Sequence, residues 1–318
     1  MNVRDLITVG RSCKFFHKEA NAKIEREMVA FFKLRDLKWD EIRFMLAHTD
    51  SFITGLSATQ AAFMSDYRGY GEAKKLDIFA PDNKCKDISQ LIEVATAYSK
   101  GITRVCPSDR ISKTVEFKHA DRNKYPFTIA VHACHTEIPR VTMFRQKHTA
   151  LFVSIGPEGF WIADVAHTLR GITFAHPTYM PLGGKAGIDD LCRLARDLDP
   201  YGLTFTMFHR LPDGTNECGK DIACPSTIRT SEDSNAFFGA FHCRPLGLKP
   251  ARRSHSTGTV WALGAAGCDT RPGMGFFVRT FELGAGAKGE RAMAAIQKSS
   301  SFGTDFVWEA RYSNVVMK

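Results

Sequence analysis

Two residues in the first quarter of the chain have types suited to binding a phosphate and a divalent cation. Gly55 follows the β-prone run 52–54 and precedes a helix-like segment at 57–64. A glycine turn that opens a helix leaves free backbone N–H groups at the positive end of the helix dipole, which suits a phosphate. Asp77 lies in the apolar run 76–79, where a carboxylate is costly unless it is paired or binds a cation. Together, Gly55 and Asp77 predict a nucleotide and metal site.

Both residues also have an ordinary structural explanation. Gly55 is then a turn glycine, and Asp77 is a carboxylate that caps a turn or pairs with Lys74 or Lys75. Because a glycine turn and an aspartate close to a strand occur in most α/β domains, the spacing alone leaves the structural and the functional explanation open.

A group of soft metal ligands lies further along the chain. His209, Cys218, Cys224, His242 and Cys243 fall within 35 residues, and such ligands could hold Zn²⁺ tetrahedrally. The five residues between Cys218 and Cys224 exceed the usual spacing in structural zinc sites, although a loop could still bring both thiolates to one ion. Isolated buried thiols are the alternative explanation.

A second cluster contains His132, Cys134 and His135. If 127–132 is a strand, His132 and Cys134 share a face, so a Cys–His nucleophile pair is a further hypothesis. The sequence identifies no third group that would orient the histidine.

These residues depend on an alternation of strands and helices for their positions. Helical periodicity over 3–48 predicts a helical start, and an α/β core follows over 49–182. The remaining part, 183–318, is an irregular, basic region that contains cysteines and a helix-like segment at 188–198. Within the core, the pattern predicts strands at 52–54, 76–79 and 127–132, and helices at 57–64, 87–99 and 140–152.

Composition limits the class of protein. The chain has 318 residues, of which 44% are hydrophobic and 24% charged, so collagen-like, disordered and disulfide-knot proteins are excluded. No apolar stretch approaches the ~18–20 residues that a membrane span needs. The N-terminus lacks a secretory pattern and the nine cysteines are odd in number, so we expect reduced thiols and an intracellular protein, cytoplasmic or nuclear.

Positive charge is concentrated near one end. The formal net charge is +9, and residues 244–318 hold eleven basic and five acidic side chains. A basic surface favours encounter with phosphate-bearing partners, but it does not identify a ligand.

Two stretches resemble a large group of fungal proteins with a nucleotidyltransferase-like fold. They are 52–62 (FITGLSATQAA) and 75–81 (KLDIFAP), and the usual pattern of the group is a Gly-Ser turn and helix followed by Asp-Leu-Asp at a strand. The segment 218–229 (CGKDIACPSTIR) resembles a Cys and Cys-Pro segment of the same group. The start, 5–14 (DLITVGRSCK), resembles the second half of an F-box.

The resemblance implies roles for several residues. In enzymes of this fold the Gly-Ser turn binds a nucleoside triphosphate, and three carboxylates on two strands hold two Mg²⁺ or Mn²⁺ ions. Gly55 and Ser57 would then contact phosphate, and Asp77 would be the catalytic and metal-binding carboxylate. The implied fold is a nucleotidyltransferase-like mixed sheet flanked by helices.

Three departures weaken the implied catalysis. Leu56 occupies the usual serine position, Lys75 replaces the first aspartate, and the strand at 127–132 has no carboxylate. One carboxylate beside a lysine does not supply the ligands that two dications need. We therefore expect a degenerate protein that binds a nucleotide or RNA phosphate, with Lys75 meeting the phosphate directly.

Two alternatives stay open. Asp66, Glu72 or Glu116 could replace the missing carboxylates in an active nucleotidyltransferase. Alternatively, the F-box-like helices could dock an adaptor of a cullin ligase, with the α/β core as a scaffold.

Overall fold

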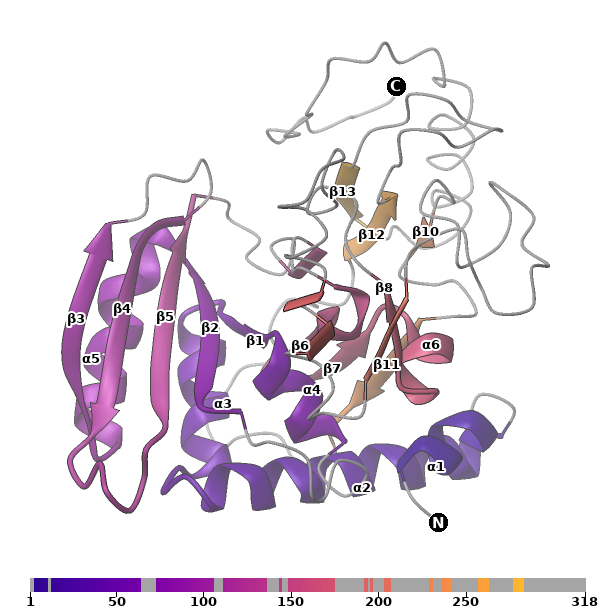
Figure 1. Cartoon of the computed structure of the whole chain (residues 1–318), viewed down its shortest axis with the longest axis horizontal. Helices are drawn as coiled ribbons and strands as arrows, with labels where there is room; N and C mark the ends of the chain where they lie inside the picture. Colours follow the sequence, from indigo (N-terminus) through magenta and orange to yellow (C-terminus); the bar gives the residue numbers. More distant parts are fainter. Residues whose placement is uncertain are drawn as a thin grey trace, which may run out of the picture.

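A computed structural model shows a mixed α/β fold built on one large sheet (Figure 1). It describes residues 3–10, 13–63, 73–105, 111–135, 143–144, 148–174, 192–193, 195–196, 203–206, 229–230, 236–241, 257–262 and 277–282. The eight strands of the sheet, in spatial order, are β11 (Phe237–Ala240), β7 (Gly159–Ile162), β6 (Val153–Ile155), β1 (Phe52–Thr54), β2 (Lys75–Pro81), β5 (Thr128–Cys134), β4 (Ile111–His119) and β3 (Tyr98–Val105). β2 and β5 are parallel, and all other neighbours in this sheet are antiparallel. The predicted mixed sheet flanked by helices is confirmed.

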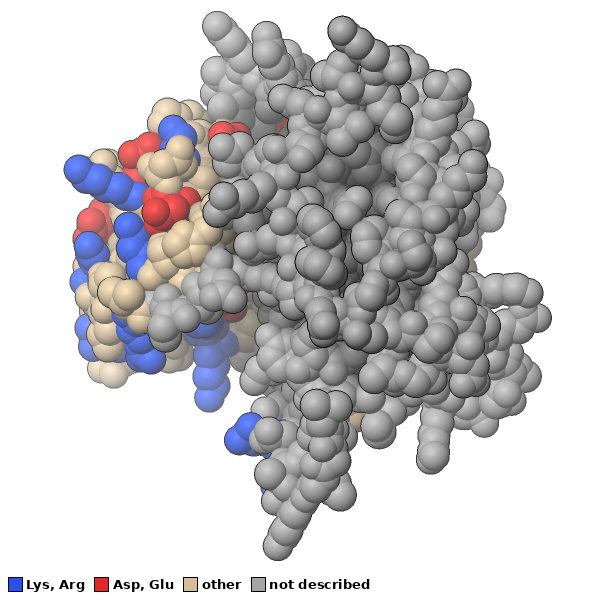
Figure 2. Space-filling view, turned by 90° about the horizontal axis from the view of Figure 1, so that it is seen from above, with Lys and Arg blue, Asp and Glu red and all other residues tan. Residues whose placement is uncertain are grey.

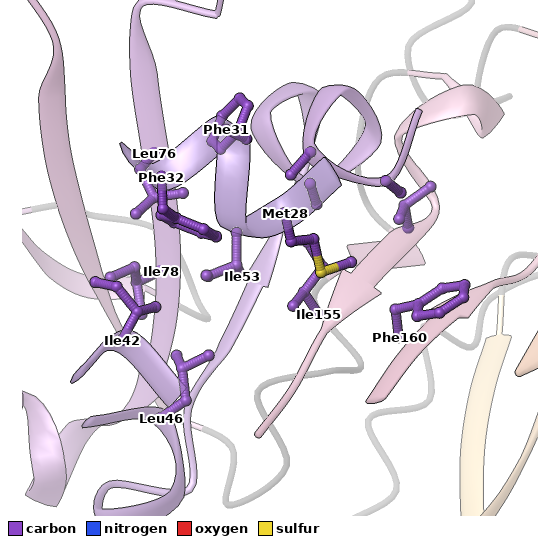
Figure 3. Packing of buried hydrophobic residues seen from close by; sticks show 14 of the residues in the cluster. Met28, Phe31, Phe32, Ile42, Leu46, Ile53, Leu76, Ile78, Ile155 and Phe160 are labelled. Carbon is purple, nitrogen blue, oxygen red and sulfur yellow. The ribbon is translucent and has the colours of Figure 1, made fainter. Parts of the chain in front are cut away.

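The helical start is also confirmed and packs against this sheet. It consists of α1 (Val3–Gly10), α2 (Lys14–Lys33) and α3 (Trp39–His48). Figure 3 shows Met28 and Phe32 of α2 directed toward Ile53 and Ile155 of the strands, and all four side chains are fully buried. Burial of each such side chain contributes ~1.5–3 kcal/mol, so the helices and the sheet stabilise each other in one core.

A buried arginine ties α3 to the rest of the core. Arg43 is 1% exposed, and its Nε donates to the carbonyl oxygen of Pro157 at 3.0 Å. Its NH1 group lies 3.4 Å from the Glu25 carboxylate on α2, and its guanidinium carbon lies 5.0 Å from the centre of the Phe241 ring. Three segments distant in sequence therefore meet at one cation.

Strand alternation separates an apolar face from a polar face on β2, β5 and β4. Alternate residues along each strand, such as Leu76, Ile129 and Phe117, belong to the main core cluster. Helix α5 (Cys85–Ala95) covers that side with Ile88 and Ile92, and it lies behind β3, β4 and β5 in Figure 1. The intervening residues form the opposite face, which we call the polar sheet face: Lys75, Asp77, Phe79, Thr128, Ala130, His132, Thr114, Glu116 and Lys118.

The remaining elements are short. Helix α4 (Leu56–Ala62) follows β1, and α6 (Val165–Leu169) follows β7. Two 3-10 turns span Asp82–Lys84 and Thr149–Leu151. A parallel pair joins β8 (Ile172–Phe174) to β9 (Thr204–Thr206), and a third sheet contains β10 (Arg229–Thr230), β12 (Thr257–Ala262) and β13 (Phe277–Glu282). None of the helices in the described residues is long and apolar enough to cross a membrane.

Two predicted elements differ from the structure. The helix expected over 140–152 is wrong where the chain is described, because Thr149–Leu151 is a 3-10 turn and Val153–Ile155 is strand β6. The threonines there join two segments of the chain: Thr149 Oγ1 accepts from the backbone N–H of Phe174, and Thr173 Oγ1 accepts from that of Ala150. Helix α5 ends at Ala95 rather than at 99, and most of 188–198 lies outside the described residues.

The β3–β4 hairpin was not predicted from the sequence. Every residue of β3 after Tyr98 is exposed, so the strand shows no alternation of apolar and polar residues. A bulge between Lys100 and Thr103 further shifts the register with β4. Strands are predicted from alternating apolar and polar residues, and an exposed edge strand such as β3 lacks that alternation.

Candidate functional site

The glycine turn has the conformation that the sequence predicts. Gly55 has φ 82° and ψ −157°, in a region that only glycine populates readily. Its carbonyl oxygen accepts from the backbone N–H of Thr59 at 3.1 Å and from the Thr59 hydroxyl at 3.2 Å, which closes the first turn of α4. The predicted strand, glycine turn and helix are therefore confirmed, while phosphate binding by Gly55 stays a prediction.

Ser57 lies inside the protein, in the first turn of α4. It is fully buried, and its Oγ atom has no hydrogen-bond partner among the described residues. Leaving a buried hydroxyl unpaired costs roughly 1–3 kcal/mol. A phosphate could reach this hydroxyl only if the atoms that cover it moved, so the predicted contact between Ser57 and a ligand requires a local rearrangement.

Asp77 is paired with two basic side chains. Its Oδ1 atom lies 2.7 Å from Lys75 Nζ and 2.7 Å from His132 Nε2. Burial alone raises the pKa of Asp77, but the hydrogen bond and charge of His132, together with Lys75, outweigh it and hold the pKa below its ordinary value. The expected pairing of Asp77 with Lys75 is confirmed.

His132 is the residue of this site whose role the sequence did not predict. Because β2 and β5 are parallel, with Phe79 opposite His132, the imidazole lies close to Asp77 on the polar sheet face. Its Nδ1 atom lies 2.9 Å from Thr114 Oγ1, and the ring stacks on Phe79 with the ring centres 4.6 Å apart. The thiol of Cys134 contacts the carbonyl oxygen of His132 at 3.7 Å, so the structure does not support the predicted Cys–His pair.

Further charged side chains continue the site across the polar sheet face. Arg104 of β3 stands opposite Thr114 and lies 3.7 Å from Glu116, and Lys118 stands opposite Thr128. Figure 2 shows Lys and Arg side chains beside Asp and Glu side chains on the described part of the surface that it presents. On the polar sheet face, Lys75 lies beside the Asp77 carboxylate and Arg104 beside the Glu116 carboxylate.

The described residues do not form a two-metal site. They contain no group of three His, Cys, Asp or Glu residues placed to hold a metal ion. Glu116 and Asp77 are separated by Ala130 of β5, hence by about 9–10 Å between Cα atoms, and Glu116 pairs with Arg104. Asp66 and Glu72, the other proposed substitutes, lie outside the described residues.

The predicted zinc ligands also lie outside the described residues. These are His209, Cys218, Cys224, His242 and Cys243, so the zinc site stays a prediction. Among the described residues, the cysteines at 13, 85, 134 and 192 form no disulfide.

A second Asp–His pair is present at the start of α6. Both carboxylate oxygens of Asp164 lie near Nδ1 of His167, at 2.9 and 3.1 Å, and both residues are buried. The two residues are three positions apart, so the pair holds the first turn of a short helix. We assign it a structural role.

Comparison of the sequence with protein-family models and with curated proteins gives no match. A functional assignment therefore rests on the geometry of the polar sheet face.

Proposed function

We propose that this is a degenerate nucleotidyltransferase-like protein that binds a phosphate group of a nucleotide or RNA on the polar sheet face, with little or no nucleotidyl transfer. The observation that carries the proposal is the pairing of Asp77. Lys75 and His132 both contact its Oδ1 atom at 2.7 Å. Lys75 occupies the position of the first aspartate in the resembled pattern, and His132 belongs to the strand that would supply the third carboxylate.

Lys75 supports the binding part of the proposal. Its side chain is 44% exposed, and only one of its three ammonium donors is needed for Asp77. The other donors can form charge-assisted hydrogen bonds with phosphate oxygens, which are shorter and stronger than neutral ones. Lys75 would thus bridge Asp77 and a bound phosphate.

The same arrangement argues against efficient transfer. Two dications repel each other and need several hard oxygen ligands, whereas Asp77 is a single carboxylate next to a lysine and a histidine. A metal ion at Asp77 would compete with both partners for the carboxylate and would meet the positive charge of Lys75. Binding without a metal is the outcome that this geometry favours.

Thermal unfolding tests the proposal. The full chain is melted with ATP, GTP, CTP, UTP or a single-stranded RNA, each in EDTA and in Mg²⁺ or Mn²⁺. A ligand at 100 times its dissociation constant adds ~2.7 kcal/mol of stability, which is a clear shift. We expect stabilisation in EDTA, loss of it in Lys75→Met, and no loss in Lys74→Met, whose exposed lysine precedes β2.

The outcomes separate the three candidate functions. No shift with any nucleotide or RNA, or an equal loss in both lysine variants, contradicts the proposal. A shift that needs a divalent metal, with incorporation of labelled nucleotide that Asp77→Ala abolishes, supports the active enzyme. Copurification of a cullin-ligase adaptor without a nucleotide shift supports the scaffold.

A further inference from the structure

Thr114 stands in the middle of a row of residues that crosses the polar sheet face. The strand register places Phe79 of β2, His132 of β5, Thr114 of β4 and Arg104 of β3 next to one another in that order. The Thr114 hydroxyl therefore has an imidazole on one side and a guanidinium-bearing residue on the other.

The contacts on the imidazole side form a continuous chain from carboxylate to hydroxyl. Asp77 Oδ1 lies 2.7 Å from His132 Nε2, and His132 Nδ1 lies 2.9 Å from Thr114 Oγ1. In an activated nucleophile, a base lies within about 2.6–3.2 Å of the hydroxyl, and a third group orients the base. Both distances satisfy that requirement, and the stacking on Phe79 further restricts the imidazole.

We propose that Thr114 is a nucleophile, activated by His132 and Asp77, that accepts a phosphoryl group from a phosphoanhydride. This inference rests on the proposed function, because the phosphates of the donor occupy the same sheet face. It adds a covalent step in which the protein itself receives one phosphoryl group. The group is not passed on to a second substrate.

The step balances as a simple displacement. Thr114 Oγ1 forms a bond to the terminal phosphorus, and the bond from that phosphorus to the bridging oxygen breaks, so that a nucleoside diphosphate leaves from a triphosphate. The hydroxyl proton passes to His132 Nδ1, the Asp77 carboxylate stabilises the resulting imidazolium, and the proton then passes to the leaving group or to water. The phosphoanhydride is the reactant that the step consumes, and no oxidant is needed.

Arg104 supplies the charge that the transferred group needs. Its side chain is 64% exposed and stands directly across from Thr114 on the edge strand β3. A guanidinium beside the attacked phosphorus can bind two of its oxygens and stabilise the charge on them. The Glu116 carboxylate, 3.7 Å from Arg104, would hold the guanidinium in place before the donor binds.

A purely structural role for Thr114 makes a different prediction about the reactivity of its hydroxyl. The residue is 8% exposed, and a hydroxyl that only fixes the orientation of His132 would be no more reactive than any other threonine. A fluorophosphonate probe distinguishes the two roles, because it phosphonylates activated hydroxyls with loss of fluoride and needs no nucleotide site.

The first experiment treats the full chain with a fluorophosphonate and identifies the adduct by intact mass and peptide mapping. We expect one adduct, on Thr114, that Thr114→Ser retains and Thr114→Val removes. His132→Gln should slow labelling by about 100-fold or more, as expected for loss of a general base. Thr128→Val is the matched control, since Thr128 lies on the same face two rows away, opposite Lys75, and this variant should still be labelled at Thr114.

The second experiment identifies the donor with ATP labelled at the α or the γ phosphorus. We expect the γ label on Thr114, whereas an α label there would overturn phosphoryl transfer. Absence of a fluorophosphonate adduct on Thr114, or equal labelling in His132→Gln, would overturn the inference even if nucleotides stabilise the protein. Conversely, fluorophosphonate labelling without any nucleotide stabilisation would contradict the proposed function. The conclusion that the Thr114 hydroxyl is activated would still stand.

Discussion

His132 Nε2 lies 2.7 Å from Asp77 Oδ1 in a diagonal contact between two parallel strands. The direct neighbour of Asp77 on β5 is Ala130, and that of His132 on β2 is Phe79. The small side chain of Ala130 leaves space in which the imidazole reaches back toward the carboxylate. This contact connects Lys75 and Asp77 on β2 to Thr114 on β4, and the pH dependence of stability tests it.

Acid should destabilise the wild-type protein more steeply than Asp77→Asn. The folded protein holds the pKa of Asp77 below its ordinary value of 3.8, so the ionised carboxylate stabilises the fold above that pH. This contribution disappears as the pH falls through the lower pKa of the folded state. Chemical unfolding at a series of pH values between about 2 and 6 measures how steeply the unfolding free energy of the wild type and of Asp77→Asn changes with pH. The exposed Asp40 gives the control Asn variant, which should follow the wild type.

Replacing Arg43 by methionine should destabilise the fold by about 3 kcal/mol or more, because Glu25 would lose its buried cationic partner and the Pro157 carbonyl its donor. Lys38→Ala, which removes the exposed 2.8 Å pair with Glu41, should leave the unfolding free energy nearly unchanged, because solvent screens such a pair. Denaturant unfolding gives both values. Equal effects of the two substitutions would show that Arg43 does not hold the three segments together.

Gly55→Ala should cost about 1–3 kcal/mol of stability, since φ 82° with ψ −157° strains any residue that has a Cβ atom. The strain lies at the turn between β1 and α4, and the melting temperature should fall accordingly. A variant with unchanged stability would mean that the turn relaxes to another conformation at no cost.

Ser57→Ala should leave stability unchanged or raise it by about 1 kcal/mol, because it removes a buried hydroxyl without a partner among the described residues. If Ser57 nevertheless binds phosphate after a rearrangement, the same variant should lose nucleotide-dependent stabilisation. Melting curves of the variant with and without ATP measure both effects, and a large loss of stability without ligand would show that the hydroxyl has a structural partner.

The parts of the fold that sequence analysis predicted are those with strong local signals. The Gly55 turn needs a glycine because of its backbone conformation, and the apolar neighbours of Asp77 mark a buried strand. By contrast, β3 is exposed along its length and has no hydrophobic period. The pairing of Asp77 with Lys75 follows from their spacing of two along one strand, whereas the contact with His132 depends on the register of strands about fifty residues apart, which no local pattern encodes.

The position of β11 has a consequence for how the chain folds. β3, β4 and β5 pair with close neighbours in sequence, so they can form early, but β11 completes the other edge by pairing Phe237 with Ile162. Closing such a long loop is slow, because its entropy is lost before the contacts form. During synthesis, β7 lacks this partner strand until residue 240 has left the ribosome. An unpaired strand edge in a nascent chain is a site at which the chain can aggregate or bind a chaperone.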